Sequence, residues 1–217
     1  MNYFAHALPF LDDPYFAAGT GVPDWLSVVD RRVRMRKKRV EPLLADPDPV
    51  AAAVAGGVWQ HLADDAKFHD TRAFAETMLD MTVLVRDALG GETGLRPGFL
   101  GHLLVEVLLD AALVARHPAE LERYYGLLAA IDPAAVERAV NRMAPRPTRR
   151  LAQMIVLFER ERILSDYLED GKLLRRLSQV MRRVGLEPLP EGFGEMLPGA
   201  RRLVERRREE LLKGIPA

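Results

Sequence analysis

The stretch PGFLGHLLVEVLLDAALVAR, residues 97–116, decides the predicted fold. Pro97 suits the first turn of a helix, and the residues that follow leave almost no polar face. A helix that is apolar on all sides is either buried in a protein core or spans a membrane. Because Glu106 and Asp110 interrupt the apolar run, a membrane span is disfavoured. We therefore expect a buried helix at the centre of an all-helical protein.

Helix signals continue on both sides of this stretch. Proline, aspartate and glycine mark the expected boundaries, and no segment shows the two-residue alternation typical of a strand. The expected helices cover residues 49–68, 70–90, 97–116, a segment from 118, a segment from 133, 148–168, 172–184 and part of 196–213. The longest irregular stretches are expected at 12–24, 39–48 and 185–195. The prediction is one all-α domain, residues 1–217, forming a bundle of about eight helices.

Composition narrows the class of protein. The 217 residues include 31 basic and 31 acidic side chains and no cysteine. Neither a disulfide framework nor a thiolate metal site can form, and the neutral balance disfavours a general nucleic-acid-binding surface. The first residues, MNYFAHALPFLDDP, contain no basic leader. We expect a cytoplasmic protein that is neither exported nor membrane-spanning.

Two helices carry polar stripes that point to chemistry. On the 97–116 helix, His102, Glu106 and Asp110 follow an i, i+4, i+8 spacing and share one face. Burial of two carboxylates without partners is costly, so a metal ion or an arginine pair is expected to face them. The preceding helix repeats the spacing with His61 and Asp65.

His69 completes the second stripe, but it lies at a helix boundary and is not among the predicted ligands. Imidazole and carboxylate groups that project from facing helices can hold manganese, iron or zinc. The alternative is that these groups form hydrogen-bonded core pairs, with Arg72, Arg86 or Arg96 as partners.

A basic run occupies residues 31–39. Seven of its nine residues are cationic: Arg31, Arg32, Arg34, Arg36, Lys37, Lys38 and Arg39. Such a run is typical either of a solvated segment or of a binding surface for an acidic or phosphate-bearing partner. Aromatic residues are not interleaved with the charges, which disfavours single-stranded nucleic acid as the partner.

Several motifs resemble the acyl carrier protein phosphodiesterases. They are MNYFAH at the N-terminus, GTGVPDWL at 19–26, QHLADDAKFHD at 60–70, GHLLVE at 101–106, and ILSDYLEDGKLLRRLSQVMRRVG at 163–185. The order and approximate spacing are similar to the family's MNxLAH, GNxxxDF, HRxID and DHFL motifs. The sequence departs from these motifs at Leu62, where the family has arginine, and at Gly101, where it has aspartate. Phe68-His69-Asp70 stands near the family's Thr-Asp.

The resemblance implies an all-helical fold related to the HD metal-dependent phosphohydrolases. It also implies a manganese-assisted hydrolysis that releases phosphopantetheine from holo acyl carrier protein. Carried over by position, His6, Asp24, His61, Asp65 and His102 match the family's polar framework. Together with the two stripes, this gives the expected ligands His6, His61, Asp65, His102 and Glu106. Asp24 and Asp110 are second choices, as ligands or as groups that orient a ligand or a catalytic water.

Three alternatives to this function stay open, and the first is nucleic-acid binding through residues 31–39, with an affinity that falls steeply with salt. The two His-x-x-x-acid pairs also resemble the ligand pattern of zinc-dependent phospholipase C and P1-type nucleases. The chain could instead be a catalytically silent helical binding or scaffold protein that keeps the family fold. The sequence favours an enzyme, with acyl carrier protein or another acidic, phosphate-bearing molecule as its partner.

Overall fold

The computed structural model describes residues 1–90 and 94–216, and this part of the chain is helical without a β-strand. The α-helices are α1 (Tyr3–Ala7), α2 (Pro14–Val29), α3 (Lys37–Val40), α4 (Pro49–His69), α5 (Arg72–Ala88), α6 (Pro97–Arg116), α7 (Pro118–Ala130), α8 (Pro133–Met143), α9 (Leu151–Glu161), α10 (Ile163–Asp166), α11 (Asp170–Arg183) and α12 (Leu197–Leu211). Short 3-10 helices occupy Leu8–Phe10, Glu41–Leu43 and Glu191–Met196. The all-α prediction is confirmed.

The helix count differs from the expected eight because four helices were not anticipated as separate elements. Three are α1, α2 and α3. The fourth is α10, which is separate because Arg162 adopts a left-handed conformation with φ 46° and ends α9. The segment predicted as one helix over 148–168 is therefore two.

Helix α2 is the clearest correction, because residues 12–24 were expected to be irregular. Asp13 caps the helix by accepting hydrogen bonds from the amides of Tyr15 and Phe16 at 3.1 and 3.0 Å, and Pro14 occupies the first turn. The interior contains Gly19, Gly21 and Pro23, which individually disfavour a helix. Burial of the face that carries Trp25 and Leu26 overrides that preference.

Contacts divide the chain into two compact units. The α6 unit comprises Met1, Lys67–Arg116 and Ile163–Ile215, and the α2 unit comprises Asn2–Ala66, His117–Arg162 and the C-terminal residues from Pro216. The prediction of a single domain over 1–217 stays a prediction.

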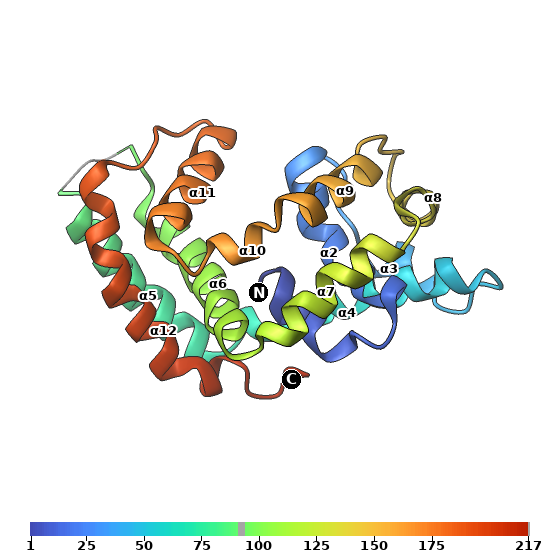
Figure 1. Cartoon of the computed structure of the whole chain (residues 1–217), viewed down its shortest axis with the longest axis horizontal. Helices are drawn as coiled ribbons and strands as arrows, with labels where there is room; N and C mark the ends of the chain where they lie inside the picture. Colours follow the sequence, from blue (N-terminus) through green and yellow to red (C-terminus); the bar gives the residue numbers. More distant parts are fainter. Residues whose placement is uncertain (91–93, 217) are drawn as a thin grey trace. The chain divides into compact units, whose positions relative to one another are not determined.

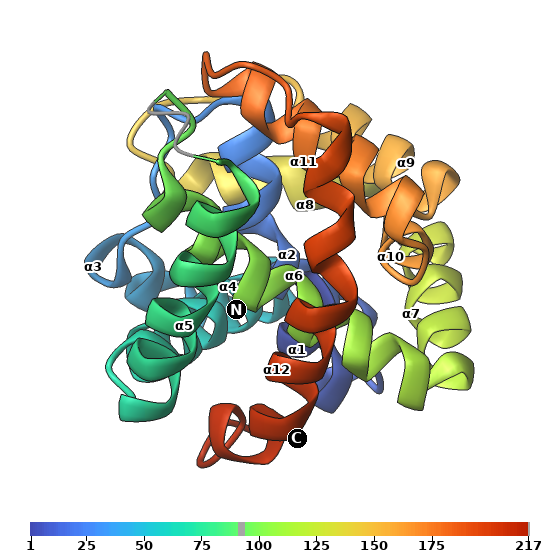
Figure 2. The same cartoon turned by 90° about the vertical axis from the view of Figure 1, so that its left-hand side faces the viewer.

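In the α6 unit, α6 packs against α5 and α12, and these three helices lie side by side (Figures 1 and 2). Residues on every side of α6 are buried, as its sequence predicts. The α5–α6 crossing is close at Gly101, where an added Cβ would lie 2.5 Å from Thr82 Oγ1. α6 is also long and apolar enough to cross a membrane, but 61% of its most apolar window is buried within the protein. A core helix of a soluble protein has the same properties, so this is weak evidence for a membrane span.

In the α2 unit, α2 contacts α1, α7, α8 and α9 (Figure 1). Helix α1 has only five residues, but Tyr3 and Phe4 anchor it in an aromatic core. The Tyr3 ring lies 4.7 Å from that of Phe158, and the Phe4 ring lies 6.2 Å from that of Tyr124. This anchoring holds His6, at the other end of the helix, inside the unit.

Candidate metal centres

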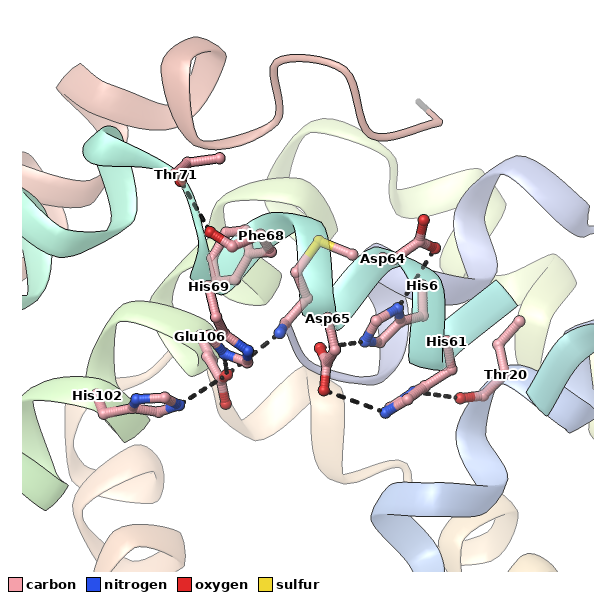
Figure 3. Close-up of polar contacts among 11 residues, drawn as sticks. His6, Thr20, His61, Asp64, Asp65, Phe68, His69, Thr71, His102 and Glu106 are labelled. Carbon is pink, nitrogen blue, oxygen red and sulfur yellow. Dashed lines mark hydrogen bonds and ion pairs between the residues drawn. The ribbon is translucent and has the colours of Figure 1, made fainter. Parts of the chain in front are cut away.

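His6, His61 and Asp65 form a group in the α2 unit, which we call the His6 cluster; the two histidines are buried and Asp65 is partly exposed (Figure 3). His61 and Asp65 lie one turn apart on α4, and His6 comes from α1. His6 Nε2 is 3.2 Å from Asp65 Oδ1, and His61 Nε2 is 3.4 Å from Asp65 Oδ2. One ligand atom from each residue lies within 4.8 Å of the other two. The His6 and His61 rings stack with their centroids 4.0 Å apart.

The backbone of α2 fixes the protonation of the His61 ring. His61 Nδ1 is 2.8 Å from the carbonyl oxygen of Thr20. A carbonyl oxygen can only accept a hydrogen bond, so Nδ1 carries the hydrogen and donates it. Nε2 is then the ring nitrogen that faces the Asp65 carboxylate. A ring nitrogen and a carboxylate oxygen that face each other can share a cation, and a backbone carbonyl behind the ring is the usual support of a histidine ligand.

His6 is buried still more deeply, with no exposed side-chain surface. Its Nδ1 lies 3.7 Å from Asp64 Oδ2, and its Nε2 lies 3.2 Å from Asp65 Oδ1. Neither nitrogen makes a hydrogen bond of acceptable geometry. Asp64 is itself held by Gln60, whose Nε2 donates to Asp64 Oδ1 at 2.8 Å. Asp64 is therefore placed to orient His6 from the side opposite Asp65.

The electrostatics of the His6 cluster favour an ionised carboxylate. Burial alone raises the pKa of Asp65, but the adjacent His6 and His61 imidazoles outweigh burial and hold that pKa well below its ordinary range. The charged form of Asp65 is the form that binds a cation. The cluster thus offers two imidazole nitrogens and one carboxylate.

His69, His102 and Glu106 form a second group, the His69 cluster, in the α6 unit (Figure 3). His69 Nε2 lies 2.8 Å and His102 Nε2 lies 3.1 Å from the same oxygen, Glu106 Oε1. The amino group of Met1 lies 3.2 Å from that oxygen. Phe74 contacts both imidazole rings edge-on, with centroid distances of 4.8 and 5.1 Å.

The imidazole rings of the two clusters differ in exposure, while the carboxylates do not follow the same order, since Asp65 is 31% and Glu106 is 16% exposed. The side chains of His69 and His102 are 31% and 42% exposed, whereas those of His6 and His61 are 0% and 3% exposed. Burial raises the pKa of Glu106, but the Met1 amino group and the two imidazoles outweigh it and leave that pKa well below its ordinary value. Glu106 is therefore ionised at neutral pH.

Seven metal ligands were predicted without a number of ions, and the structure divides five of them between two clusters. His6, His61 and Asp65 lie in one, and His102 and Glu106 lie in the other. The remaining two, Asp24 and Asp110, belong to neither group found among the described residues. Asp24 lies on α2, and Asp110 is fully buried on α6.

Three residues in or beside these clusters were not predicted as site residues. His69 completes the second cluster, and its i+8 spacing from His61 was the available signal. Asp64 stands beside a predicted ligand, but nothing in the sequence separates its role from that of Asp65. The carbonyl of Thr20 could not be predicted, because a main-chain contact between α2 and α4 depends on tertiary packing.

The structure also shows the surroundings of Arg72, which was considered as a partner of the buried carboxylates, and of Gly101, where the sequence departs from the family motif. Arg72, considered as a core partner, pairs with Glu76 at 2.6 Å instead. Gly101 stands where the resembling family has aspartate, and its contact with Thr82 leaves no room for a ligand side chain.

The basic run, residues 31–39, is anchored by apolar side chains. Val33 and Met35 are buried, while the seven cationic residues of the run are exposed. Lys37 Nζ lies over the Trp59 ring, 5.0 Å from its centroid. Within the described part of the chain, none of the seven forms an ion pair, although neighbouring Asp30 pairs with Arg146 at 2.8 Å. Their charge is therefore available to a partner.

Comparison with known proteins yields no match: no family model, no curated protein and no solved structure is significantly similar to this chain.

Proposed function

We propose that this protein is a metal-dependent phosphodiester hydrolase whose ion is held by His6, His61 and Asp65, with Mn²⁺ as the expected ion. The observation that carries the proposal is the approach of His6 Nε2 and His61 Nε2 to the ionised carboxylate of Asp65. Thr20 accepts the hydrogen bond of His61 Nδ1, which leaves Nε2 as the ring nitrogen that faces Asp65. Metal–ligand bonds of about 2.0–2.2 Å place neighbouring ligand atoms roughly 3–3.5 Å apart. The 3.2 and 3.4 Å separations in the cluster fit this spacing.

Some residues of the proposed site would bind the ion, and others would orient the residues that bind it. His6, His61 and Asp65 hold the ion, while the Thr20 carbonyl fixes the His61 ring and the Asp64 carboxylate faces the His6 ring from the opposite side. A bound divalent ion would polarise a phosphoryl oxygen and lower the pKa of a water molecule. Asp65 would also keep the local charge favourable for cation binding, because its carboxylate stays ionised.

The substrate class comes from the sequence resemblance and from the basic run. The resemblance favours holo acyl carrier protein, with hydrolysis of the phosphodiester that joins phosphopantetheine to serine. The exposed, unpaired charges of residues 31–39 are suited to an acidic protein of this kind, because long-range attraction steers such partners together. The related HD-type fold is part of the same proposal.

Elemental analysis tests the metal centre. The protein is purified without chelator or affinity metal, and its manganese, zinc and iron are measured before and after Mn²⁺ is added. His61→Ala should lose the ion of the His6 cluster, whereas His117→Ala, at the α7 boundary and outside both clusters, should keep it. Wild-type protein that takes up no metal, or equal uptake by His61→Ala, would contradict the proposal. Zinc or iron in place of manganese would correct only the identity of the ion.

Hydrolysis of holo acyl carrier protein tests the substrate. Release of phosphopantetheine by the Mn²⁺-loaded protein, lost in His61→Ala, is the expected result. The triple variant Arg31→Ala/Arg32→Ala/Arg34→Ala should raise KM and flatten its salt dependence, while Arg160→Ala, an exposed control on α9, should not. A metal-loaded protein that cleaves no phosphodiester would favour the alternative, a silent binding or scaffold protein.

A further inference from the structure

The His69 cluster has the composition of a metal site in its own right. His102 and Glu106 lie one turn apart on α6, and His69 ends α4. Both imidazole Nε2 atoms approach Glu106 Oε1, at 2.8 and 3.1 Å. Octahedral coordination with bonds of about 2.1 Å separates adjacent ligand atoms by roughly 3 Å. The spacing of the three side chains is therefore compatible with one shared ion.

Aromatic side chains position the two rings, and Glu106 Oε1, which also contacts the Met1 amino group at 3.2 Å, is the hydrogen-bond partner of both Nε2 atoms. Phe74 packs edge-on against both imidazoles, and Phe68 contacts His69 in the same way at 5.4 Å. Aromatic contacts of this kind restrict ring orientation but offer no hydrogen-bond acceptor to the nitrogens. The rings are thus positioned by packing, and their Nε2 atoms meet at an ionised carboxylate.

The donor set selects a class of ion. Two imidazoles and one carboxylate suit borderline transition metals, whereas Mg²⁺ and Ca²⁺ prefer sites made of oxygen. Partial exposure of His69 and His102, at 31% and 42%, gives solvent access to the site. An ion held by three protein ligands with solvent access should exchange readily.

We propose that His69, His102 and Glu106 form a second, exchangeable site for a borderline divalent ion such as Co²⁺ or Zn²⁺, independent of the His6 cluster. His6 and His61 are buried, Asp65 is partly exposed, and all three lie in the α2 unit, while His69, His102 and Glu106 lie in the α6 unit. The inference does not rest on the proposed hydrolase activity.

Cobalt titration tests the site, since Co²⁺ bound by imidazole gives a visible absorption spectrum. Binding is measured by that absorbance and by equilibrium dialysis for wild type, His102→Ala, Glu106→Gln and the control His117→Ala. We expect His102→Ala and Glu106→Gln each to lose one bound ion, or to weaken its binding by at least about 10-fold. His117→Ala should match wild type. Excess Mg²⁺ should not displace the cobalt.

Variants of the two clusters separate the two proposals. His61→Ala should retain the cobalt bound by the His69 cluster, and His102→Ala should retain the ion bound by the His6 cluster. Far-UV circular dichroism confirms that each variant is folded, and Glu106→Gln preserves side-chain size if His102→Ala does not fold. Unchanged cobalt stoichiometry and affinity in folded His102→Ala or Glu106→Gln would overturn this second site, whatever the result for His61.

Discussion

Substitution of Gly57 by alanine tests how the packing of α2 against α4 supports the His6 cluster. A Cβ at Gly57 would lie 2.1 Å from the carbonyl oxygen of Phe16 and 2.7 Å from the amide nitrogen of Thr20. Both are main-chain atoms of α2, so no flexible side chain can move aside. Restoring a contact of about 3.2 Å requires the helices to separate by roughly 1 Å. Overpacking of this kind costs about 1–3 kcal/mol.

The same displacement reaches the metal ligands through Thr20. Its carbonyl oxygen lies 2.8 Å from His61 Nδ1, and a shift of about 1 Å would place the pair beyond hydrogen-bond distance. Loss of such a support typically weakens metal binding about 10–100-fold. Gly57→Ala should therefore lower the melting temperature by several degrees, about 2–4 °C per kcal/mol, and weaken Mn²⁺ binding to the His6 cluster.

Gly126→Ala is the matched control. Gly126 is exposed on α7, and an added Cβ meets nothing within 4 Å. The substitution should stabilise the protein by about 0.5–1 kcal/mol, because alanine favours the helix. Thermal melts and Mn²⁺ titrations of both variants decide the outcome. If Gly57→Ala is as stable as wild type and binds Mn²⁺ equally well, the reasoning from helix packing is refuted.

Three further predictions concern other parts of the fold. Asp13→Ala removes the α2 cap and should cost about 1 kcal/mol in urea unfolding; an unchanged midpoint would contradict the cap. The hydrogen bond from Arg142 holds the pKa of Asp46 below its ordinary value. The Asp46–Arg142 pair therefore contributes its full stability above about pH 4, and this contribution is lost as the pH falls through the pKa of Asp46 in the folded protein. Asp46→Asn should thus melt below wild type at pH 7 and approach it at pH 3, whereas a constant difference would exclude this linkage. Gly101→Asp should destabilise the α6 unit through Thr82 without adding a bound ion, and one additional ion by elemental analysis would show that the crossing can open.

The fold was predictable where local sequence and burial agree. Pro97 and the apolar surface of α6 point to the same buried helix, and the Asp132-Pro133 cap of α8 is confirmed by the 2.9 Å hydrogen bond that Asp132 accepts from the amide of Ala134. Helix α2 was missed because Gly19, Gly21 and Pro23 are locally unfavourable. Glycine is favourable here because of tertiary packing: without side chains, Gly19 and Gly57 allow the main chains of α2 and α4 to come into contact. Helix propensity describes single residues in isolation and does not include this packing between helices.

The candidate site was predictable at the level of helix spacing and no further. The i, i+4 rule correctly placed His61 beside Asp65 and His102 beside Glu106. It could not show that these pairs contribute to separate clusters, because that depends on which distant residue meets each pair. His6 reaches the first pair through the aromatic anchoring of α1, a contact without a sequence period. That His6 binds metal stays a prediction.

The support behind each cluster gives it a distinct expected behaviour. In the His6 cluster, a main-chain carbonyl determines which nitrogen of His61 is free, so the ligand is set before any ion arrives. In the His69 cluster, phenylalanine edges position the rings, and Glu106 alone connects both imidazoles. A site whose ligands are already in place needs little rearrangement to bind an ion, and its fixed geometry favours some ions over others. A site positioned by packing can adjust to ions of different size, so in competition titrations the affinities of the His69 cluster for Mn²⁺, Co²⁺ and Zn²⁺ should follow the intrinsic order of these ions, while those of the His6 cluster should depart from it.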